Sequence, residues 1–188
     1  LLTMSTEIQA IRWDGDAIVL LDQTLLPGEE VYVECRDVDT LVDAVRRLVV
    51  RGAPALGAVG GYGVALAMHQ GQREGWSPER LDAEVDRVRE ARPTAVNLAW
   101  GVDRVRQLMA QGVEAVLAEA DRIVAEDTAA NRQLSRHGAD WILERCARRP
   151  LRVVTHCNTG ALATTGWGTA FGIIRDLAER GEIELVYV

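Results

Sequence analysis

The stretch that decides the fold is LRVVTHCNTGALATTGWGTAFGIIRDLAERGEIELVYV, residues 151–188. It begins with a short apolar strand over 151–157 and continues through a segment rich in glycine and threonine. A helical pattern over 167–180 and a second apolar run over 183–188 follow, so the stretch predicts one βαβ unit. Parallel strands are normally buried on both faces, and two strands cannot cover each other. We therefore expect the first βαβ unit of a Rossmann-like parallel sheet that continues beyond Val188.

The residues before this unit predict a small antiparallel sheet followed by helices. Apolar positions alternate over 8–13, 17–22 and 31–35, and the turn pairs Asp14-Gly15 and Pro27-Gly28 separate these runs. Helical periodicity then takes over. The expected helices are 40–51, 54–69, 78–92, 95–112 and 113–149. The predicted fold class is thus α/β, with a small N-terminal antiparallel meander plus helices ahead of the βαβ unit.

These patterns divide the chain into three regions. We expect an N-terminal α/β domain over 1–112, a long helical connector over 113–149, and the start of a truncated C-terminal domain over 150–188. The helix over 54–69 contains several glycines, which disfavour a helix by propensity alone. They are typical of a helix whose backbone packs very closely against a neighbour or a ligand.

Composition limits the classes of function. The 188 residues are 48% hydrophobic and 26% charged, as in ordinary globular proteins. All 21 basic residues are arginine and the formal charge is −7, which argues against nucleic acid as a partner and excludes a lysine Schiff base. The sequence has neither a membrane-spanning run nor a signal-peptide layout, so we expect a cytoplasmic protein with no membrane partner. Cys35, Cys146 and Cys157 suit reduced thiols, and no spacing favours a metal site.

The first candidate site is Arg51-Gly52-Ala53-Pro54, just before the glycine-rich helix. Free backbone N–H groups and the positive end of the helix dipole favour an anion there, and an arginine adds a bidentate fork for phosphate. The alternative is a capping glycine and a proline start, with Arg51 in solvent.

The second candidate is Arg92, in RPTAVNLAWG at a break between two predicted helices. A second arginine would complete a phosphate clamp if the fold brought it close to the first. The alternative, which the spacing alone favours, is a basic residue that interacts with the dipole at the end of a helix.

The third candidate is Cys157, at the end of the predicted strand in THCNTGALA. Ligands of open α/β sheets bind at the carboxyl ends of strands, and a nearby helix N-terminus favours the thiolate. The alternative is a small core residue. His156 is adjacent, and strand alternation would send the two side chains to opposite faces, so we expect no Cys-His pair. Cys35 and Cys146 are interpreted as structural.

The fourth pattern is Asp127 and Asn131, at i and i+4 of the long predicted helix and hence on one of its faces. Such a pair could orient a loop or contact a substrate. An exposed polar face explains the spacing equally well.

Together, RGAPALG at 51–57, RPTAVNLAWGVDR at 92–104, EDTAAN at 126–131 and THCNTGALAT at 155–164 resemble one known family. It is the family of the 5-methylthioribose-1-phosphate isomerases of methionine salvage. The wider family includes ribose-1,5-bisphosphate isomerases and regulatory subunits of the translation-initiation guanine nucleotide exchange factor. The resemblance runs in order through nearly the whole chain, including IRWDG and LLDQTLLPGE near the N-terminus and GWGTAFGIIR at 166–175.

The resemblance implies a homodimeric enzyme that converts an aldose 1-phosphate into the ketose 1-phosphate without metal or cofactor. Residue by residue, Arg51, Gly52 and Ala53 match the family's phosphate-binding segment, Arg92 its second substrate arginine, and Cys157 its catalytic cysteine. The family's catalytic aspartate, a glutamine and an Asn-Lys pair belong to a C-terminal region that follows these motifs. The chain is therefore expected to be an N-terminal half that is inactive alone. A ribose-1,5-bisphosphate isomerase and a non-catalytic sensor of sugar phosphates or nucleotides remain alternatives.

Overall fold

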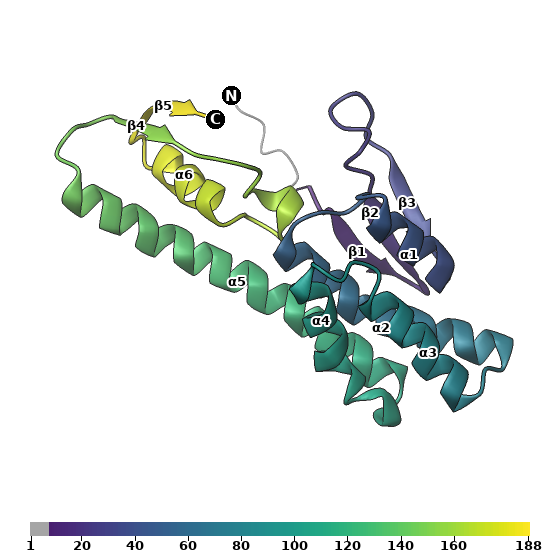
Figure 1. Cartoon of the computed structure of the whole chain (residues 1–188). Coiled ribbons are helices and arrows are strands. Elements are labelled where there is room, and N and C mark those ends of the chain that lie inside the picture. The colour runs from purple at the N-terminus through teal and green to yellow at the C-terminus, as the bar shows by residue number, and fades with distance from the viewer. Residues whose placement is uncertain (1–7) are drawn as a thin grey trace.

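A single long helix, α5 (Val113–Arg145), runs along the molecule. The computed structural model describes residues 8–188, so residues 1–7 of the predicted N-terminal domain lie outside it. Figure 1 shows the preceding elements packed around the start of α5 and the following elements along its end. Buried apolar side chains form a larger cluster at the first group and a smaller one at the second. α5 joins the two groups because it contributes Val116 to the larger cluster and Ala139 to the smaller.

The N-terminal sheet is antiparallel. Its strands are β1 (Ile11–Asp14), β2 (Ala17–Leu21) and β3 (Tyr32–Cys35), hydrogen-bonded in that order. Gly15, with a φ of +64°, makes the tight turn between β1 and β2. β2 lies in the middle and all of its residues are buried. The predicted meander is confirmed, except that the first strand begins at Ile11 and not at residue 8.

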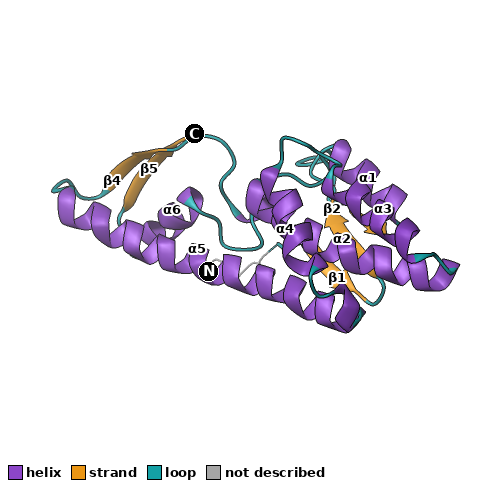
Figure 2. Ribbon diagram, turned by 60° about the horizontal axis from the view of Figure 1, so that its bottom comes forward, coloured by secondary structure: helices purple, strands orange, loops and turns teal. Residues whose placement is uncertain are grey.

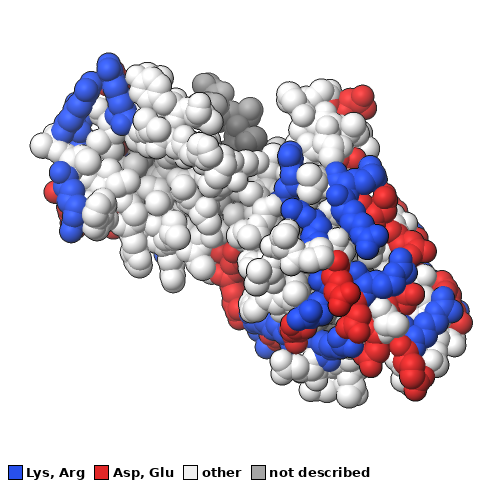
Figure 3. All heavy atoms as spheres, viewed as in Figure 1, with Lys and Arg blue, Asp and Glu red and all other residues white. Residues whose placement is uncertain are grey.

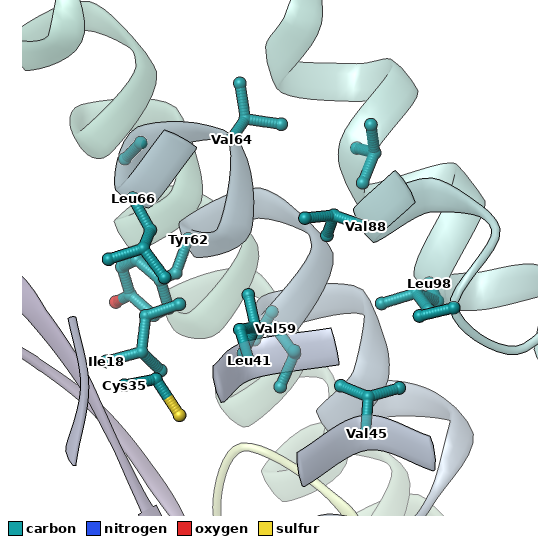
Figure 4. Close-up of a cluster of buried hydrophobic side chains, with 14 of the residues drawn as sticks. Ile18, Cys35, Leu41, Val45, Val59, Tyr62, Val64, Leu66, Val88 and Leu98 are labelled. Carbon is teal, nitrogen blue, oxygen red and sulfur yellow. The ribbon is translucent and has the colours of Figure 1, made fainter. Parts of the chain in front are cut away.

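Four helices cover this sheet and each other: α1 (Val38–Arg46), α2 (Ala53–Glu74), α3 (Pro78–Arg89) and α4 (Val96–Arg106). α2 is the central helix, and most of its residues are buried. Figure 4 shows Val59, Tyr62 and Leu66 of α2 among apolar side chains of the sheet and of the other helices. These neighbours include Ile18, Cys35, Leu41, Val88 and Leu98.

The glycines of α2 bring its backbone against α4. A methyl group on Gly60 would overlap the carbonyl oxygen of Leu98, and one on Gly101 would overlap that of Gly57. The sequence left open whether these glycines allow close packing against a neighbouring element or against a ligand. The contacts show close packing against a neighbouring helix.

Several helix starts and ends differ from the sequence prediction. α1 begins at Val38 because Asp37 caps it, accepting a hydrogen bond from the Thr40 amide at 2.7 Å. α2 continues beyond residue 69 to Glu74, where Gly75 in the left-handed conformation ends it. The helix predicted over 95–112 is shorter: α4 begins at Val96 without a side-chain cap and ends at Arg106.

The later boundaries differ too. α5 ends at Arg145, earlier than residue 149, and passes Gly138 without interruption. A methyl group at Gly138 would lie 2.5 Å from Ile173 Cδ1, so this glycine makes room for the following helix. The strand predicted to reach residue 157 ends at Val154, and Trp167 lies in the loop before the helix that was predicted to include it.

The βαβ unit is present as predicted. β4 (Leu151–Val154) and β5 (Ile183–Tyr187) pair in parallel, and α6 (Ala170–Glu179) connects them. Figures 1 and 2 both place α6 beside α5, with the two strands at the end of the molecule away from β1–β3. The fold is α/β, with a three-stranded antiparallel sheet and a two-stranded parallel sheet.

The surface is charged unevenly. In Figure 3, arginine and acidic side chains gather over the N-terminal helices and at the far end near β4, and uncharged atoms cover the region between. No helix in the described part of the chain is long and apolar enough to cross a membrane.

Candidate functional site

A pocket of about 670 Å³ lies beyond the carboxyl end of β4. The chain leaves β4 in a loop, residues 155–169, that includes the short 3-10 helix η2 (Ala161–Ala163); we call it the pocket loop. Most of the lining comes from the pocket loop, and the rest from α6 and the segments near both ends of the described chain. The lining residues are Ile8, Thr155, Cys157, Asn158, Thr159, Gly160, Ala161, Leu162, Phe171, Arg175 and Val188.

Cys157 lines this pocket and is exposed to solvent. The alternative of a core cysteine is therefore wrong. Because β4 ends at Val154, the thiol stands on the loop and not on the strand, and its backbone is left-handed with a φ of +55°. A non-glycine residue in that conformation is uncommon and is often found at functional sites.

Hydrogen bonds fix the pocket loop against the start of α6. The Phe171 amide donates to Thr159 Oγ1 at 3.0 Å, and the Thr169 amide donates to the Thr159 carbonyl at 2.8 Å. The Gly160 amide donates to Asn158 Oδ1 at 3.1 Å. These bonds tie the Thr159 part of the loop to the end of the loop and to the start of α6.

Asp127 and Asn131 hold the same loop from α5. Asp127 Oδ2 accepts hydrogen bonds from the amide and the hydroxyl of Thr165, at 3.0 and 2.7 Å. Asn131 is 4% exposed, and its Nδ2 donates to the Gly166 carbonyl at 3.2 Å. The spacing of Asp127 and Asn131 left open whether they orient a loop, contact a substrate or form an exposed polar face. Their hydrogen bonds show that they orient the pocket loop.

Gly52 brings the first and third sequence motifs together. It precedes α2 with a φ of +99°, and a methyl group there would overlap the carbonyl oxygen of Ala163 and lie 2.5 Å from its Cα. The Arg51 segment, residues 49–53, therefore touches the pocket loop. Within residues 8–188 no side chain caps α2 and its first turn holds no acid, so the amide groups near Ala53 remain available to an anion.

The two predicted phosphate arginines lie outside the Cys157 pocket. Arg51 is exposed and Arg92 is half-buried between α3 and α4. Neither forms an ion pair with a described carboxylate, and neither is among the residues that line the pocket. The structure thus places the Arg51 segment beside the pocket loop, whereas Arg92 stays a prediction from sequence.

Arg175 is a pocket residue that the sequence analysis missed. Its guanidinium lies 4.0 Å from the centre of the Trp167 ring and donates to the Trp167 carbonyl at 3.2 Å. Arg132 also stacks on this ring, and the indole N–H donates to Ser135 Oγ at 2.8 Å. Among the described lining residues Arg175 has the one basic or acidic side chain. GWGTAFGIIR contained the signal, but a surface helix explains an isolated arginine equally well.

Residues 49–188 match the sequence model of the Initiation factor 2 subunit family. The chain belongs to this family. The relationship predicted from the four motifs is thereby confirmed, and it extends over the Arg51 segment, the long helix and the βαβ unit.

Relatives in the Initiation factor 2 subunit family have names that point to one activity. A protein of Nocardia farcinica named "Probable bifunctional methylthioribose-1-phosphate isomerase/methylthioribulose-1-phosphate dehydratase" is 49% identical over 95% of this chain and 33% of its own length. Further relatives named methylthioribose-1-phosphate isomerase are 40–44% identical. The chain spans about half the length of these relatives.

Two solved family structures have the same fold. The crystal structure of translation initiation factor eIF-2B, subunit delta, from A. fulgidus has a TM-score of 0.78 and 39% identity, over 96% of this chain and 54% of that chain. The 5-methylthioribose 1-phosphate isomerase from Pyrococcus horikoshii has a TM-score of 0.78 and 28% identity, over 95% and 51%. Family membership alone therefore leaves an enzyme and an initiation factor as candidate functions.

Proposed function

We propose that the protein is a 5-methylthioribose-1-phosphate isomerase and that these residues form the N-terminal half of it. The observation that carries the proposal is the contact of Gly52 with Ala163, in a chain whose relatives at 40–49% identity are named for this activity. The contact puts the predicted phosphate-binding segment beside the loop that holds the predicted catalytic thiol. A sugar phosphate isomerised at its sugar carbons would contact both at once.

The Arg51 segment binds the phosphate in this proposal. The amides of Gly52 and Ala53 and the open start of α2 supply donors and a positive dipole end, and Arg51 supplies a bidentate fork. Arg92 is the second arginine that contacts the substrate. No carboxylate in the first turn of α2 competes with the phosphate.

Cys157 acts at the sugar carbons. In an aldose 1-phosphate the anomeric oxygen carries the phosphoryl group, so an acid must protonate the ring oxygen as the ring opens. That acid is the aspartate that the family resemblance implies in the C-terminal half. The Cys157 thiolate then either removes the C2 proton, which returns to C1, or assists a direct hydrogen shift from C2 to C1. In both routes the C1 carbon is reduced as C2 is oxidised.

The complete enzyme has a larger architecture than these residues. We place the N-terminal α/β domain over 1–112, the helical connector over 113–149 and the start of a Rossmann-like domain over 150–188. The open β4–β5 sheet continues in that domain, where further strands and helices would cover its exposed Val154 and Leu185. The enzyme is a cytoplasmic homodimer that requires no cofactor.

The proposal is tested by following the conversion of 5-methylthioribose 1-phosphate by ³¹P NMR in the complete protein. Cys157→Ser should abolish turnover without changing the urea midpoint, because the side chain is exposed and supports no core packing. Cys146→Ser is the matched control, since that thiol is also exposed but lies outside the pocket. Turnover near the parental rate in Cys157→Ser would refute the catalytic role.

A second candidate function is a non-catalytic sensor of sugar phosphates or nucleotides, which the 39% identity to the A. fulgidus initiation factor favours. A third is isomerisation of ribose 1,5-bisphosphate. Thermal unfolding with each ligand separates a nucleotide sensor from the two isomerases, since a ligand at 100 times its Kd stabilises a fold by about 2.7 kcal/mol. Stabilisation by a nucleoside monophosphate and not by either sugar phosphate would favour the sensor.

A further inference from the structure

Gln23 lies between the Arg51 segment and the pocket loop. It follows β2 and is 4% exposed, so its amide is buried. Its backbone N–H donates to the Val49 carbonyl at 3.0 Å, and its side-chain Nε2 donates to the Leu162 carbonyl at 2.8 Å. One residue thus binds two segments that are far apart in the sequence.

Both partners of Gln23 belong to the proposed site. Val49 begins the Arg51 segment, two positions before Arg51 itself. Leu162 lines the pocket and is next to Ala163, which contacts Gly52. The neighbouring Asp22 accepts from the amide and hydroxyl of Thr24, at 2.9 and 2.6 Å, which tightens the turn after β2.

We propose that Gln23 is a positioning residue that sets the distance between the Arg51 segment and the pocket loop. The proposal rests on the proposed function, in which a sugar phosphate contacts both segments at once. A ligand that spans them requires the correct spacing, because small errors in position weaken contacts at one of its ends. Inorganic phosphate is too short to span them and depends on the Arg51 segment alone.

The variant Gln23→Met separates positioning from general stability. Methionine keeps the length and burial of the side chain but cannot donate to the Leu162 carbonyl. Gln23→Glu is a second variant of the same shape, and it replaces the donor with an acceptor. Gln70→Met is the matched control: it removes hydrogen bonds to the Val38 amide and to Glu74, at 2.9 Å each, away from the pocket loop.

Both readouts use the complete protein. The first is hydrogen exchange followed by mass spectrometry. The Ala163 amide donates to the Gly160 carbonyl at 3.1 Å, inside the segment that Gln23 holds. We expect several-fold faster exchange in peptides covering 159–165 in both Gln23 variants, with the peptides of α2 unchanged. In Gln70→Met these loop peptides should exchange at the parental rate.

The second readout is the Kd of two probes, measured by calorimetry. For 5-methylthioribose 1-phosphate we expect the Kd to rise about tenfold in Gln23→Met, which corresponds to about 1.4 kcal/mol. For inorganic phosphate the Kd should stay within twofold of the parental value. This split between the probes is what a merely destabilised protein would not show.

Three outcomes would overturn the proposal. They are unchanged loop exchange in both Gln23 variants, an equal loss of affinity for both probes, and the same loss in Gln70→Met. If the complete parental protein does not bind 5-methylthioribose 1-phosphate, the proposed function fails, and hydrogen exchange alone then decides whether Gln23 couples the two segments.

Discussion

Replacement of Gly52 by alanine tests the contact on which the proposed site depends. Gly52 has a φ of +99° and lies so close to Ala163 that a methyl group would overlap its carbonyl oxygen. Gly112 provides a matched control, because it also precedes a helix with a φ of +99° but has nothing within 4 Å of the position of a methyl group. Comparison of the two variants separates the cost of the contact from the cost of the backbone conformation.

The magnitude follows from two contributions. Forcing alanine into this sparsely populated backbone conformation costs of order 1–3 kcal/mol at either position. Overlap with well-packed neighbours adds about 1–3 kcal/mol, and this second contribution applies to Gly52 alone. We therefore expect Gly112→Ala to lower the free energy of unfolding by about 1–3 kcal/mol and Gly52→Ala by about 2–6 kcal/mol. The larger loss is a substantial part of the 5–15 kcal/mol typical of a domain.

Urea unfolding followed by circular dichroism measures both losses, and hydrogen exchange measures the pocket loop. If the pocket loop moves away to admit the methyl group, the loss in the free energy of unfolding becomes smaller, and hydrogen exchange over 159–165 becomes faster. Equal free-energy losses in the two variants, together with parental exchange of the loop in Gly52→Ala, would refute the contact between the Arg51 segment and the pocket loop.

Two further predictions concern ionisable groups. Burial raises the pKa of the Cys35 thiol to about 12. Titration of the native protein with a disulfide reagent at pH 8 should therefore modify the exposed thiols of Cys146 and Cys157. Cys35 should stay unreacted until urea is added. The bidentate hydrogen bonds from Arg89, at 2.8 and 2.9 Å, lower the pKa of Asp103 below its ordinary 3.8. The stability that these bonds provide is therefore present above pH 3.8 and is lost as the pH falls below it. Arg89→Gln should therefore make the free energy of unfolding fall less steeply between about pH 5 and pH 3, and an unchanged slope would contradict this.

Local sequence patterns predicted the elements well because they depend on residues that are close in the chain. Alternating apolar residues around Asp14-Gly15 predicted the antiparallel sheet, and the long helical period predicted α5. The errors lie at element ends. The first helix begins directly after its cap, Asp37, and not near Thr40 as predicted. The strand that was predicted to include Cys157 ends at Val154. Several capping residues and loop hydrogen bonds compete at such ends, so periodicity alone does not decide them.

The candidate site was predicted only in part. Cys157 and the Arg51 segment were identified from their motifs, but Arg175 and Gln23 were missed. The single signal for each of these two was its place in a motif of the family resemblance. Arg175 lines the pocket from α6, and its guanidinium stacks on Trp167, which was predicted to lie in that helix but lies in the loop before it. Neither periodicity nor composition contains such a contact.

The sequence by itself determined the α/β class, the order of the elements, the family relationship, and the residue types available for phosphate and thiol chemistry. These depend on patterns within a few residues and on motifs in a fixed order. Only the tertiary structure decided which motifs meet. Gln23 binds Leu162 across 139 positions, and Gly52 lies against Ala163 because a glycine lacks the methyl group that would hold the two backbones apart. Contacts between such distant segments arise from the packing of α2, α5 and the pocket loop together, and no local pattern specifies them.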